Sequence, residues 1–393
     1  RFLGHLHPII LLAKEQKVSP TMGLTLLTPQ YFTETNSHTF KVRLVTNSLI
    51  VTRDKDFYSQ VLGEKQANFT NSRGIKKVFG YFFPNSVIVV DGEQWHRIRK
   101  ILTKAINATS FDLIIPSIVR NVSYVLKENS QGSCLANEQP SILLINRIIF
   151  DGFHCLVYDW DPETLKFNPE SSKLLDACNT LGEAMGERFL LPYPFLWKIP
   201  TKKNRKYAEA QNTVINFIKK FLKEQKEQFH TNKEEILKMK KRSLLQEMLI
   251  ANENEDQSRR LTNDELIDQV GILFFGGYDT TSNVISFCLN YLARNPDKQD
   301  YLRSLLKEAF PLGEEDILSL GIEKIEKIKY LSHFVSEVHR ICPLVNIGRD
   351  CIKDTEINGI QFKKGEAVTI DNIEIGMRED FWNNMKDLEI FRQ

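Results

Sequence analysis

One segment, residues 262–295, constrains the fold of this chain more than any other. Thr262 and Glu265 have the spacing of a capping box, which predicts a helix start, and Asn295-Pro296 predicts where the helix stops. The apolar residues between these signals would cover most of the helix circumference, which is typical of a helix through the centre of a large domain. The sequence therefore predicts one long buried helix.

The middle of this helix contains poor helix formers. Gly276 and Gly277 each cost about 1 kcal/mol relative to Ala, and Asp279, Thr280 and Thr281 follow closely. Paired glycines let a flat ligand lie against the backbone, and Thr hydroxyls that bond to carbonyls one turn earlier can bend or open a helix. An acid beside a hydroxyl in such a groove is a candidate proton relay. From the residues alone, close crossing of another helix explains the glycines equally well.

Strand patterns flank the helical part of the chain at both ends. Alternating apolar residues predict a hairpin at residues 40–52, and Asn358-Gly359 predicts a second hairpin, followed by a strand at 367–370. Helical periodicity dominates from about residue 95 to about residue 345. We therefore expect one α-rich α+β domain covering residues 1–393, with small sheets near both ends.

Composition limits the classes of function. Lys+Arg 52 against Asp+Glu 50 leave a formal net charge of +2, so no overall charge attracts nucleic acid, and none is expected as a partner. The six cysteines show neither CxxC nor zinc-finger spacing, which predicts reduced thiols and no metal site. No stretch approaches the roughly 18 consecutive apolar residues of a membrane span.

Two more pairs of residues each share one face of a predicted helix. Trp95 and Arg99 are four positions apart, and an indole N–H beside a guanidinium suits the binding of a carboxylate. Glu337 and Arg340 are three positions apart, and either pair alone is compatible with an ordinary solvated surface. The far side of the first helix carries a basic stripe that we expect to face solvent or an acidic partner: Arg97, Lys100 and Lys104.

Taken in order, three motifs resemble those of the C-helix, I-helix and K-helix of the cytochrome P-450 haem-thiolate monooxygenases, of microsomal-like type. The motifs are Trp95-His96-Arg97-Ile98-Arg99, Gly276-Gly277-Tyr278-Asp279-Thr280-Thr281 and Glu337-Val338-His339-Arg340. The resemblance covers essentially the whole chain and implies the cytochrome P-450 fold with a haem cofactor. It favours the ligand-groove interpretation of the central helix over simple helix crossing.

The resemblance also implies roles for individual residues. Asp279 and Thr280 are the expected catalytic residues, which would pass protons to the oxygen site. Glu337 and Arg340 are expected to form a buried structural pair. The residues expected to bind the cofactor are Trp95, Arg99 and Arg349, at the haem propionates, and Gly277, beside the oxygen site.

The sequence departs from the family at one decisive place. The family's cysteine loop, Phe-x-x-Gly-x-Arg-x-Cys-x-Gly, would follow the final residues Phe391-Arg392-Gln393, and none of the six cysteines lies in such a loop. We therefore assign no iron ligand. Because the cysteine thiolate favours cleavage of the oxygen–oxygen bond, we expect the chain to be inactive alone. We also expect it to be a fragment, incomplete at the C-terminus and, because no Met precedes Arg1, at the N-terminus.

For the complete protein, the resemblance implies insertion of one oxygen atom from O2 into an apolar small molecule of the sterol, fatty acid or xenobiotic class. Electrons would come from a reductase. Two alternatives stay open: a haem-free or inactive lipid-binding protein of the same fold, and an isomerase or lyase that rearranges a peroxide. The Asp279-Thr280 pair argues against the second, because rearranging a peroxide needs no proton delivery to O2.

Two further expectations concern apolar segments. Phe274, Phe275 and residues 82–84 are candidates for a substrate pocket, or for ordinary core. Residues 189–197, rich in aromatic side chains and followed by Lys202-Lys203, are expected to touch a membrane interface or to form a buried loop. An intracellular location at the endoplasmic reticulum membrane is expected if an N-terminal anchor exists.

Overall fold

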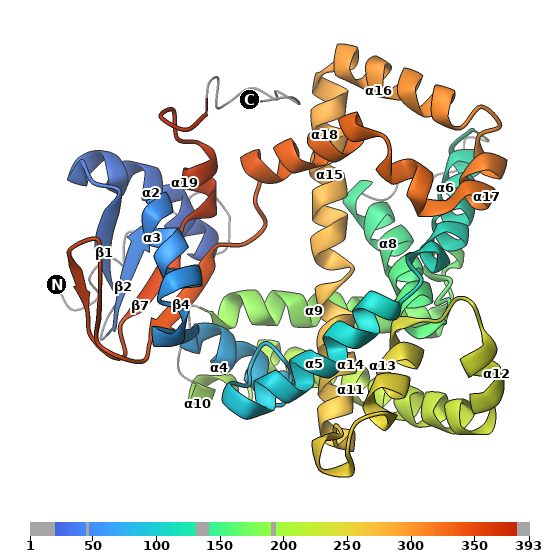
Figure 1. Cartoon of the computed structure of the whole chain (residues 1–393), viewed down its shortest axis with the longest axis horizontal. Coiled ribbons are helices and arrows are strands. Elements are labelled where there is room, and N and C mark those ends of the chain that lie inside the picture. Colours follow the sequence, from blue (N-terminus) through green and yellow to red (C-terminus); the bar gives the residue numbers. More distant parts are fainter. Residues whose placement is uncertain (1–19, 45–46, 131–140, 190–193, 383–393) are drawn as a thin grey trace.

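The computed structural model describes residues 20–44, 47–130, 141–189 and 194–382. The predicted central helix is present in it as two consecutive helices, α14 (Asn263–Gly276) and α15 (Asp279–Arg294), which stand upright at the centre of Figure 1. The capping box is confirmed: the Thr262 hydroxyl accepts from the Glu265 backbone N–H, and the Glu265 carboxylate accepts from the Thr262 N–H. The prediction of one continuous helix is wrong, because the regular helix is interrupted between Gly276 and Asp279; its start and end are as predicted.

Amphipathic helices pack around α14 and bury one large apolar cluster. In α11 (Lys202–Thr231), for example, Val214, Ile218 and Leu222 recur at helical spacing and are buried, whereas the lysines between them face solvent. The other helices of this part are α4 (Arg73–Phe82), α5 (Gly92–Ala108), α6 (Ile114–Ser130), α8 (Ser141–Tyr158), α9 (Pro169–Arg188), α10 (Pro194–Trp197), α12 (Lys233–Lys238) and α13 (Leu244–Glu253).

Three helices follow α15: α16 (Pro296–Ala309), α17 (Glu314–Glu326) and α18 (Lys329–Ile341). Two of them, α16 and α18, form a second, smaller apolar cluster with α15, and Phe334 and Val338 of α18 are buried in it. The described residues also contain short helical turns: Gln60–Glu64, Gln66–Asn68, Phe111–Leu113, Thr164–Lys166 and Gln257–Arg259.

Strands from the two ends of the chain join in one five-stranded sheet, in the order β1-β2-β7-β4-β3. The predicted first hairpin is confirmed as β1 (Thr39–Leu44) paired antiparallel with β2 (Asn47–Thr52). The parallel pairing of β2 with β7 (Ala367–Ile370) connects the N-terminal strands to the C-terminal ones. The remaining strands of this sheet are β3 (Phe69–Asn71) and β4 (Ile347–Cys351).

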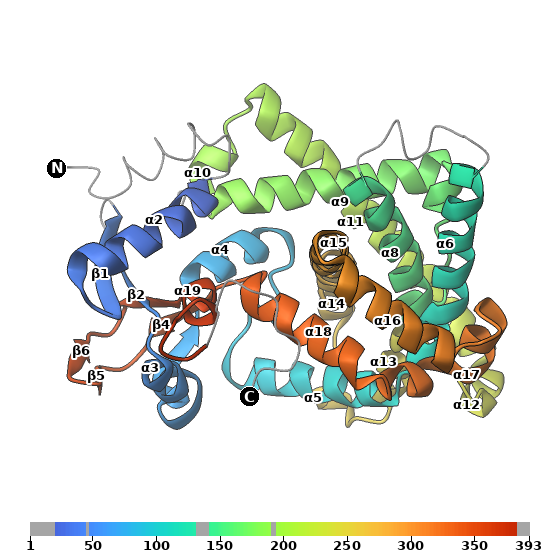
Figure 2. The same cartoon turned by 90° about the horizontal axis from the view of Figure 1, so that it is seen from above.

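The second predicted hairpin is also confirmed and forms a separate two-stranded sheet, β5 (Thr355–Ile357) and β6 (Ile360–Phe362). Asn358 and Gly359 both have positive φ, 50° and 76°, as a two-residue turn of the primed type requires. The sheets lie on one side of the molecule with α2 (Pro20–Thr35), α3 (Lys55–Ser59) and α19 (Asn372–Gly376), and the helical part lies on the other side (Figures 1 and 2).

The fold is the predicted α-rich α+β architecture, in which the small sheets at the two ends of the sequence meet in space. Within the described ranges, no helix combines the length and the hydropathy that crossing a membrane requires.

Candidate functional site

The interruption of the central helix is built from side chains that bond back to the backbone. Thr280 Oγ1 donates to the Gly276 carbonyl at 2.8 Å, and Thr281 Oγ1 donates to the Gly277 carbonyl at the same distance. Ser282 and Asn283 repeat the pattern on the next two carbonyls. The predicted hydroxyl-to-carbonyl bonds are therefore confirmed, and each satisfies a carbonyl at the place where α14 ends.

The two adjacent glycines face different surroundings. A Cβ built on Gly276 would meet nothing within 4 Å, whereas one built on Gly277 would lie 1.9 Å from the ring of Phe153 on α8. Gly276 therefore leaves open space beside the helix, and Gly277 allows the aromatic ring of α8 to pack against the backbone. The close-packing explanation therefore holds for Gly277, whereas Gly276 has the open space that the ligand explanation requires.

A cavity of about 590 Å³ lies beside Gly276. Its volume is within the range of small-molecule sites. Phe275 lines it, but Phe274 does not, since its ring is fully buried 4.8 Å from that of Tyr158. Phe82, Phe83 and Pro84 border a different, smaller hollow. The apolar residues of the larger cavity come from α4, the loop before α5, α9 and α14: Phe79, Ile88, Met185, Phe189, Ile272 and Phe275.

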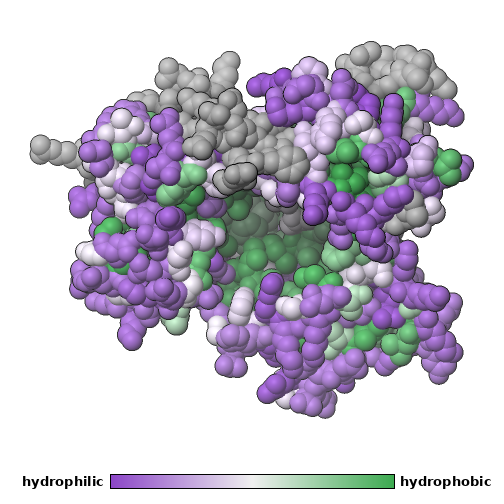
Figure 3. All heavy atoms as spheres, turned by 45° about the horizontal axis from the view of Figure 1, so that its top comes forward, coloured by the Kyte–Doolittle hydropathy of each residue, from purple (hydrophilic) through white to green (hydrophobic). Residues whose placement is uncertain are grey.

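The face of the molecule shown in Figure 3 is hollowed at its centre, and the floor of the hollow is hydrophobic. Asp279 and Thr280, predicted as catalytic residues, both line the cavity beside the helix interruption. Asp279 is open to the cavity, yet the surrounding protein partly desolvates its carboxylate and raises its pKa above the ordinary value. A hydrogen bond from Asn283 lowers this pKa by a smaller amount. A carboxyl with this environment takes up a proton more readily than one on the surface.

Two of the residues predicted to bind propionates carry cationic groups without a carboxylate partner among the described residues. Arg99 is exposed on α5 and makes no ion pair there, and Arg349 on β4 donates only to the neighbouring Gly348 carbonyl. Burial lowers the pKa of Arg349, which a nearby anion would counteract. Trp95 packs its ring partly against the main core.

The neighbouring basic residues, by contrast, are paired within the chain. Arg97 binds Glu265, and Lys100 and Lys104 both bind Glu255. Lys100 and Lys104 are exposed, as expected, but the carboxylates that the stripe binds belong to this chain, since the first turn of α14 and the loop before it supply them. The hydrogen bonds from Lys104 and Lys100 lower the pKa of Glu255 to about 2.

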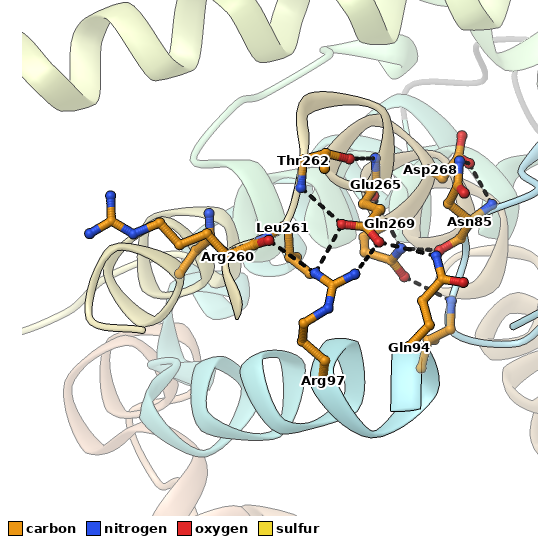
Figure 4. A network of polar contacts seen from close by, with 11 residues as sticks. Asn85, Gln94, Arg97, Arg260, Leu261, Thr262, Glu265, Asp268 and Gln269 are labelled. Carbon is orange, nitrogen blue, oxygen red and sulfur yellow. Dashed lines mark hydrogen bonds and ion pairs between the residues drawn. The ribbon is translucent and has the colours of Figure 1, made fainter. Parts of the chain in front are cut away.

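A polar network behind the cavity was not predicted from the sequence (Figure 4). Gln269 of α14 is fully buried; its Oε1 accepts from the Val87 N–H at 2.9 Å, and its Nε2 donates to the Asn85 carbonyl at 2.8 Å. Asp268 accepts from the backbone and side chain of Asn85 at 2.7 and 2.9 Å. These bonds hold the loop that carries Ile88 into the cavity. The available signal was a pair of polar residues on an otherwise apolar helix.

Glu337 and Arg340 form a bidentate ion pair on α18. Arg340 Nε and Nη2 each reach one Glu337 oxygen at 2.8 Å, and both side chains are only 7% exposed. Arg340 Nη1 also donates to the carbonyl of Gly376, and its guanidinium lies 5.3 Å from the ring centre of Trp382. The pair thus joins α18 to the segment that follows the large sheet.

None of the described cysteines lines the cavity. Burial raises the pKa of Cys155 and Cys288 to about 11 and raises that of Cys178 further, so these thiols stay protonated. Cys134 lies outside the described residues. Across residues 20–382, apart from the gaps named above, no cluster of His, Cys, Asp and Glu could hold a metal ion.

Comparison with known proteins identifies the class. The family model described as Cytochrome P450 matches residues 5–391, so this chain belongs to the cytochrome P450 family. Cytochrome P450 3A29 of Sus scrofa is 26% identical over 345 residues, which cover 85% of this chain and 65% of the relative. Cytochrome P450 4p1 of Drosophila melanogaster is 35% identical over a shorter stretch of 132 residues, 32% of this chain and 25% of the relative.

A solved structure has the same fold. The retinoic acid bound cyanobacterial CYP120A1 matches with a TM-score of 0.73 at 20% identity, covering 99% of this chain and 79% of the other. The chain spans about 65% of the length of the first curated relatives that it matches. The predicted family and fold are confirmed.

Haem, the cofactor of this family, is the cofactor of this chain. The residues present fit the anionic edge of such a group: the guanidiniums of Arg99 and Arg349 have no carboxylate partner among the described residues, whereas Arg73, Lys76 and Arg97 each have one. The described residues do not supply the iron ligand, since none of their cysteines lines the cavity.

Proposed function

We propose that this chain provides the substrate cavity and the proton-handling residues of a haem-dependent monooxygenase that acts on an apolar small molecule. One observation carries the proposal. The central helix is interrupted where Thr280 and Asp279 face an apolar cavity, and the freed carbonyls are satisfied by side chains. A helix that only filled the core would have no need of this costly arrangement.

Haem would be held at its propionates by Trp95, Arg99 and Arg349. When bound, haem supplies the activation of O2, and the protein supplies position, protons and shielding from water. Arg349 is half-buried and a planar guanidinium binds carboxylates bidentately, so it would form the stronger of the two ionic contacts. The roles of these three residues rest on the family resemblance and, for Arg99 and Arg349, on the lack of a carboxylate partner among the described residues.

Asp279 and Thr280 would act as the proton relay. The Thr280 hydroxyl donates its hydrogen to the Gly276 carbonyl, so its oxygen can still accept a hydrogen bond from a water in the cavity. Asp279, whose pKa is raised by desolvation, takes a proton from solvent and donates it to that water, which releases one of its own protons toward the cavity at the same time. Gly276 leaves the space that the water and the reacting group need.

The substrate would be an apolar small molecule of the sterol, fatty acid or xenobiotic class, and electrons would come from a reductase. Residues 1–393 would form one cytochrome P450 domain. On α10 and just after it, Phe195 and Ile199 are 65% and 47% exposed beside several lysines, which supports a peripheral contact with a membrane surface. Trp197, between them, is buried and belongs to the core.

The experiment uses protein expressed from the complete gene. A carbon monoxide difference spectrum of the reduced protein should show a thiolate-type band, and product should appear with consumption of electrons from a reductase. Thr280→Ala should lower product per electron and raise peroxide release. The absence of the band would favour the lipid-binding alternative, and a band with turnover that needs no electron donor would favour the isomerase. Unchanged coupling in Thr280→Ala would refute the relay.

A further inference from the structure

The cavity beside α14 contains few polar side chains, and most of their hydrogen-bonding atoms are already used. Thr280 donates its hydrogen to the Gly276 carbonyl. Glu183 lies at the rim, 3.7 Å from Lys206 Nζ, and both side chains are largely exposed. Asp279 as a carboxylate only accepts hydrogen bonds. The remaining polar side chains of the lining are Asn179 of α9 and Tyr278.

Tyr278 determines how the Asn179 amide is oriented. The Tyr278 side chain is only 2% exposed, its ring lies edge-on to Phe150 at 5.1 Å, and its hydroxyl donates to Asn179 Oδ1 at 3.0 Å. Burial holds the pKa of Tyr278 well above its usual value, so the phenol keeps its hydrogen and needs an acceptor. The reverse orientation of the amide would direct an N–H group at a phenol that needs to donate, and would leave that buried hydrogen without an acceptor.

Both N–H groups of the Asn179 amide nitrogen are therefore available to donate hydrogen bonds. Neither has an acceptor among the described residues, and Asn179 is half-buried in the cavity lining. It is the one lining side chain of the described chain that holds donor hydrogens not committed elsewhere. An oxygen acceptor on a bound molecule would satisfy it, and an amide fixed by a buried phenol loses little freedom when it binds.

The charges of the lining indicate the class of molecule. Two carboxylates, Glu183 and Asp279, line the cavity, and no cationic side chain of the described residues does. An anionic ligand such as a carboxylic acid would therefore be repelled, whereas a neutral carbonyl would not. A protonated amine carries donors only, so it cannot use the Asn179 hydrogens.

Three glycines determine the shape of the free space. Gly182 and Gly186 are four positions apart on α9, Gly276 is on α14, and a Cβ built on any of the three would meet no atom within 4 Å. All three line the cavity. The missing side chains leave smooth helix backbone on two sides, which suits a flat, rigid ring system more than a branched chain.

We propose that Asn179 is a specificity-determining residue, whose amide donates a hydrogen bond to the carbonyl oxygen of a neutral, flat, apolar ligand held between α9 and α14. The inference rests on the proposed function in one respect, that this cavity is the substrate site. It adds the chemical class of the substrate, a neutral ketone or ester of a rigid ring system, and names the residue that recognises it.

The test needs no haem and uses fluorescence of the chain mixed with one of two dyes. The first dye is the neutral ketone 6-propionyl-2-dimethylaminonaphthalene, whose emission moves to longer wavelength when its carbonyl accepts a hydrogen bond. The second is 2-dimethylaminonaphthalene, which has the same rings and no ketone. We expect the ketone to bind about five- to tenfold more tightly, the ratio that one net hydrogen bond provides.

The variant is Asn179→Asp, which keeps the acceptor for Tyr278 and loses both donors at neutral pH. It should bind the ketone about five- to tenfold more weakly, with emission at shorter wavelength, and bind the second dye as before. Asn216→Asp makes the same charge change on the exposed face of α11 and should change neither dye. Gly186→Leu should weaken both dyes together, because its side chain would fill the cavity.

The outcomes separate the two proposals. Equal binding of both dyes to the chain, or unchanged ketone emission in Asn179→Asp, would overturn the role of Asn179 and leave the cavity as a ligand site. If neither dye binds to folded chain, or if Gly186→Leu binds both dyes as the unmodified chain does, the cavity is not the ligand site and the proposed function fails with the inference.

Discussion

Replacing each of the two central glycines by alanine should give opposite effects, although they are neighbours on one helix. At Gly277 the new methyl would lie 1.9 Å from two atoms of the Phe153 ring. The ring or the helix must shift by about 1.5 Å to restore an ordinary contact of 3.4 Å. Overpacking of this kind costs roughly 1–3 kcal/mol, and the severity of the overlap favours the upper value.

The net effect includes the helix propensity of alanine. Alanine is favoured over glycine by about 1 kcal/mol in a helix, and Gly277 has right-handed helical angles, φ −93° and ψ −34°, that alanine adopts freely. We therefore expect Gly277→Ala to lower the free energy of unfolding by about 2 kcal/mol. Gly276→Ala meets no atom within 4 Å, so it should raise the free energy of unfolding by up to about 1 kcal/mol.

Urea unfolding followed by circular dichroism measures both changes, provided that the dependence of the free energy of unfolding on urea concentration is the same in each variant. The double variant Gly277→Ala, Phe153→Leu should recover part of the loss, because a smaller side chain leaves room for the methyl and the two sites are in contact. If Gly277→Ala is as stable as Gly276→Ala, the glycine at position 277 is not required for the close packing of α8 on the central helix, and this explanation is refuted.

The remaining predictions concern the ion pair, the polar network and one buried histidine. Glu337→Ala removes the buried carboxylate that binds two guanidinium nitrogens of Arg340 and should cost about 3–5 kcal/mol in urea unfolding; a loss below about 1 kcal/mol would show that the pair is superficial. Gln269→Leu removes the acceptor of the Val87 amide, so hydrogen exchange of that amide should accelerate by roughly one to two orders of magnitude. Gln269→Glu keeps an acceptor and should restore slow exchange. Equal exchange rates in the unmodified chain and both variants would show that Gln269 does not hold the Val87 loop. Burial lowers the pKa of His154 to about 3, so the unfolded chain takes up a proton below its ordinary pKa and the folded chain does not. This difference alone removes about 2 kcal/mol of stability between about pH 6.5 and pH 5, and Asp151, whose pKa burial raises to about 6, offsets part of it. The stability of His154→Leu relative to the unmodified chain should therefore rise by about 2 kcal/mol as the pH falls over this range; a constant difference would mean that the fold does not lower the pKa of His154.

Sequence alone was sufficient where the decisive interactions are local. The capping box at Thr262, the bonds from Thr280 and Thr281 to carbonyls four positions earlier, and the turn at Asn358-Gly359 each join residues within a few positions of one another. Residue identity and spacing determine such contacts before any tertiary structure forms. The order of three motifs along the chain was likewise enough to indicate the family.

Tertiary structure decided everything that depends on distant partners. Gly276 and Gly277 are equivalent in sequence, and only the position of Phe153 on another helix separates the one beside open space from the one that is packed. Equally, no pattern shows that Gln269 meets Val87, or that Lys100 has an internal partner. The chemistry of a side chain shows that it needs a hydrogen-bonding or charged partner. Which residue becomes that partner depends on how helices and strands far apart in the chain pack together, and the periodicity of the sequence does not determine those contacts.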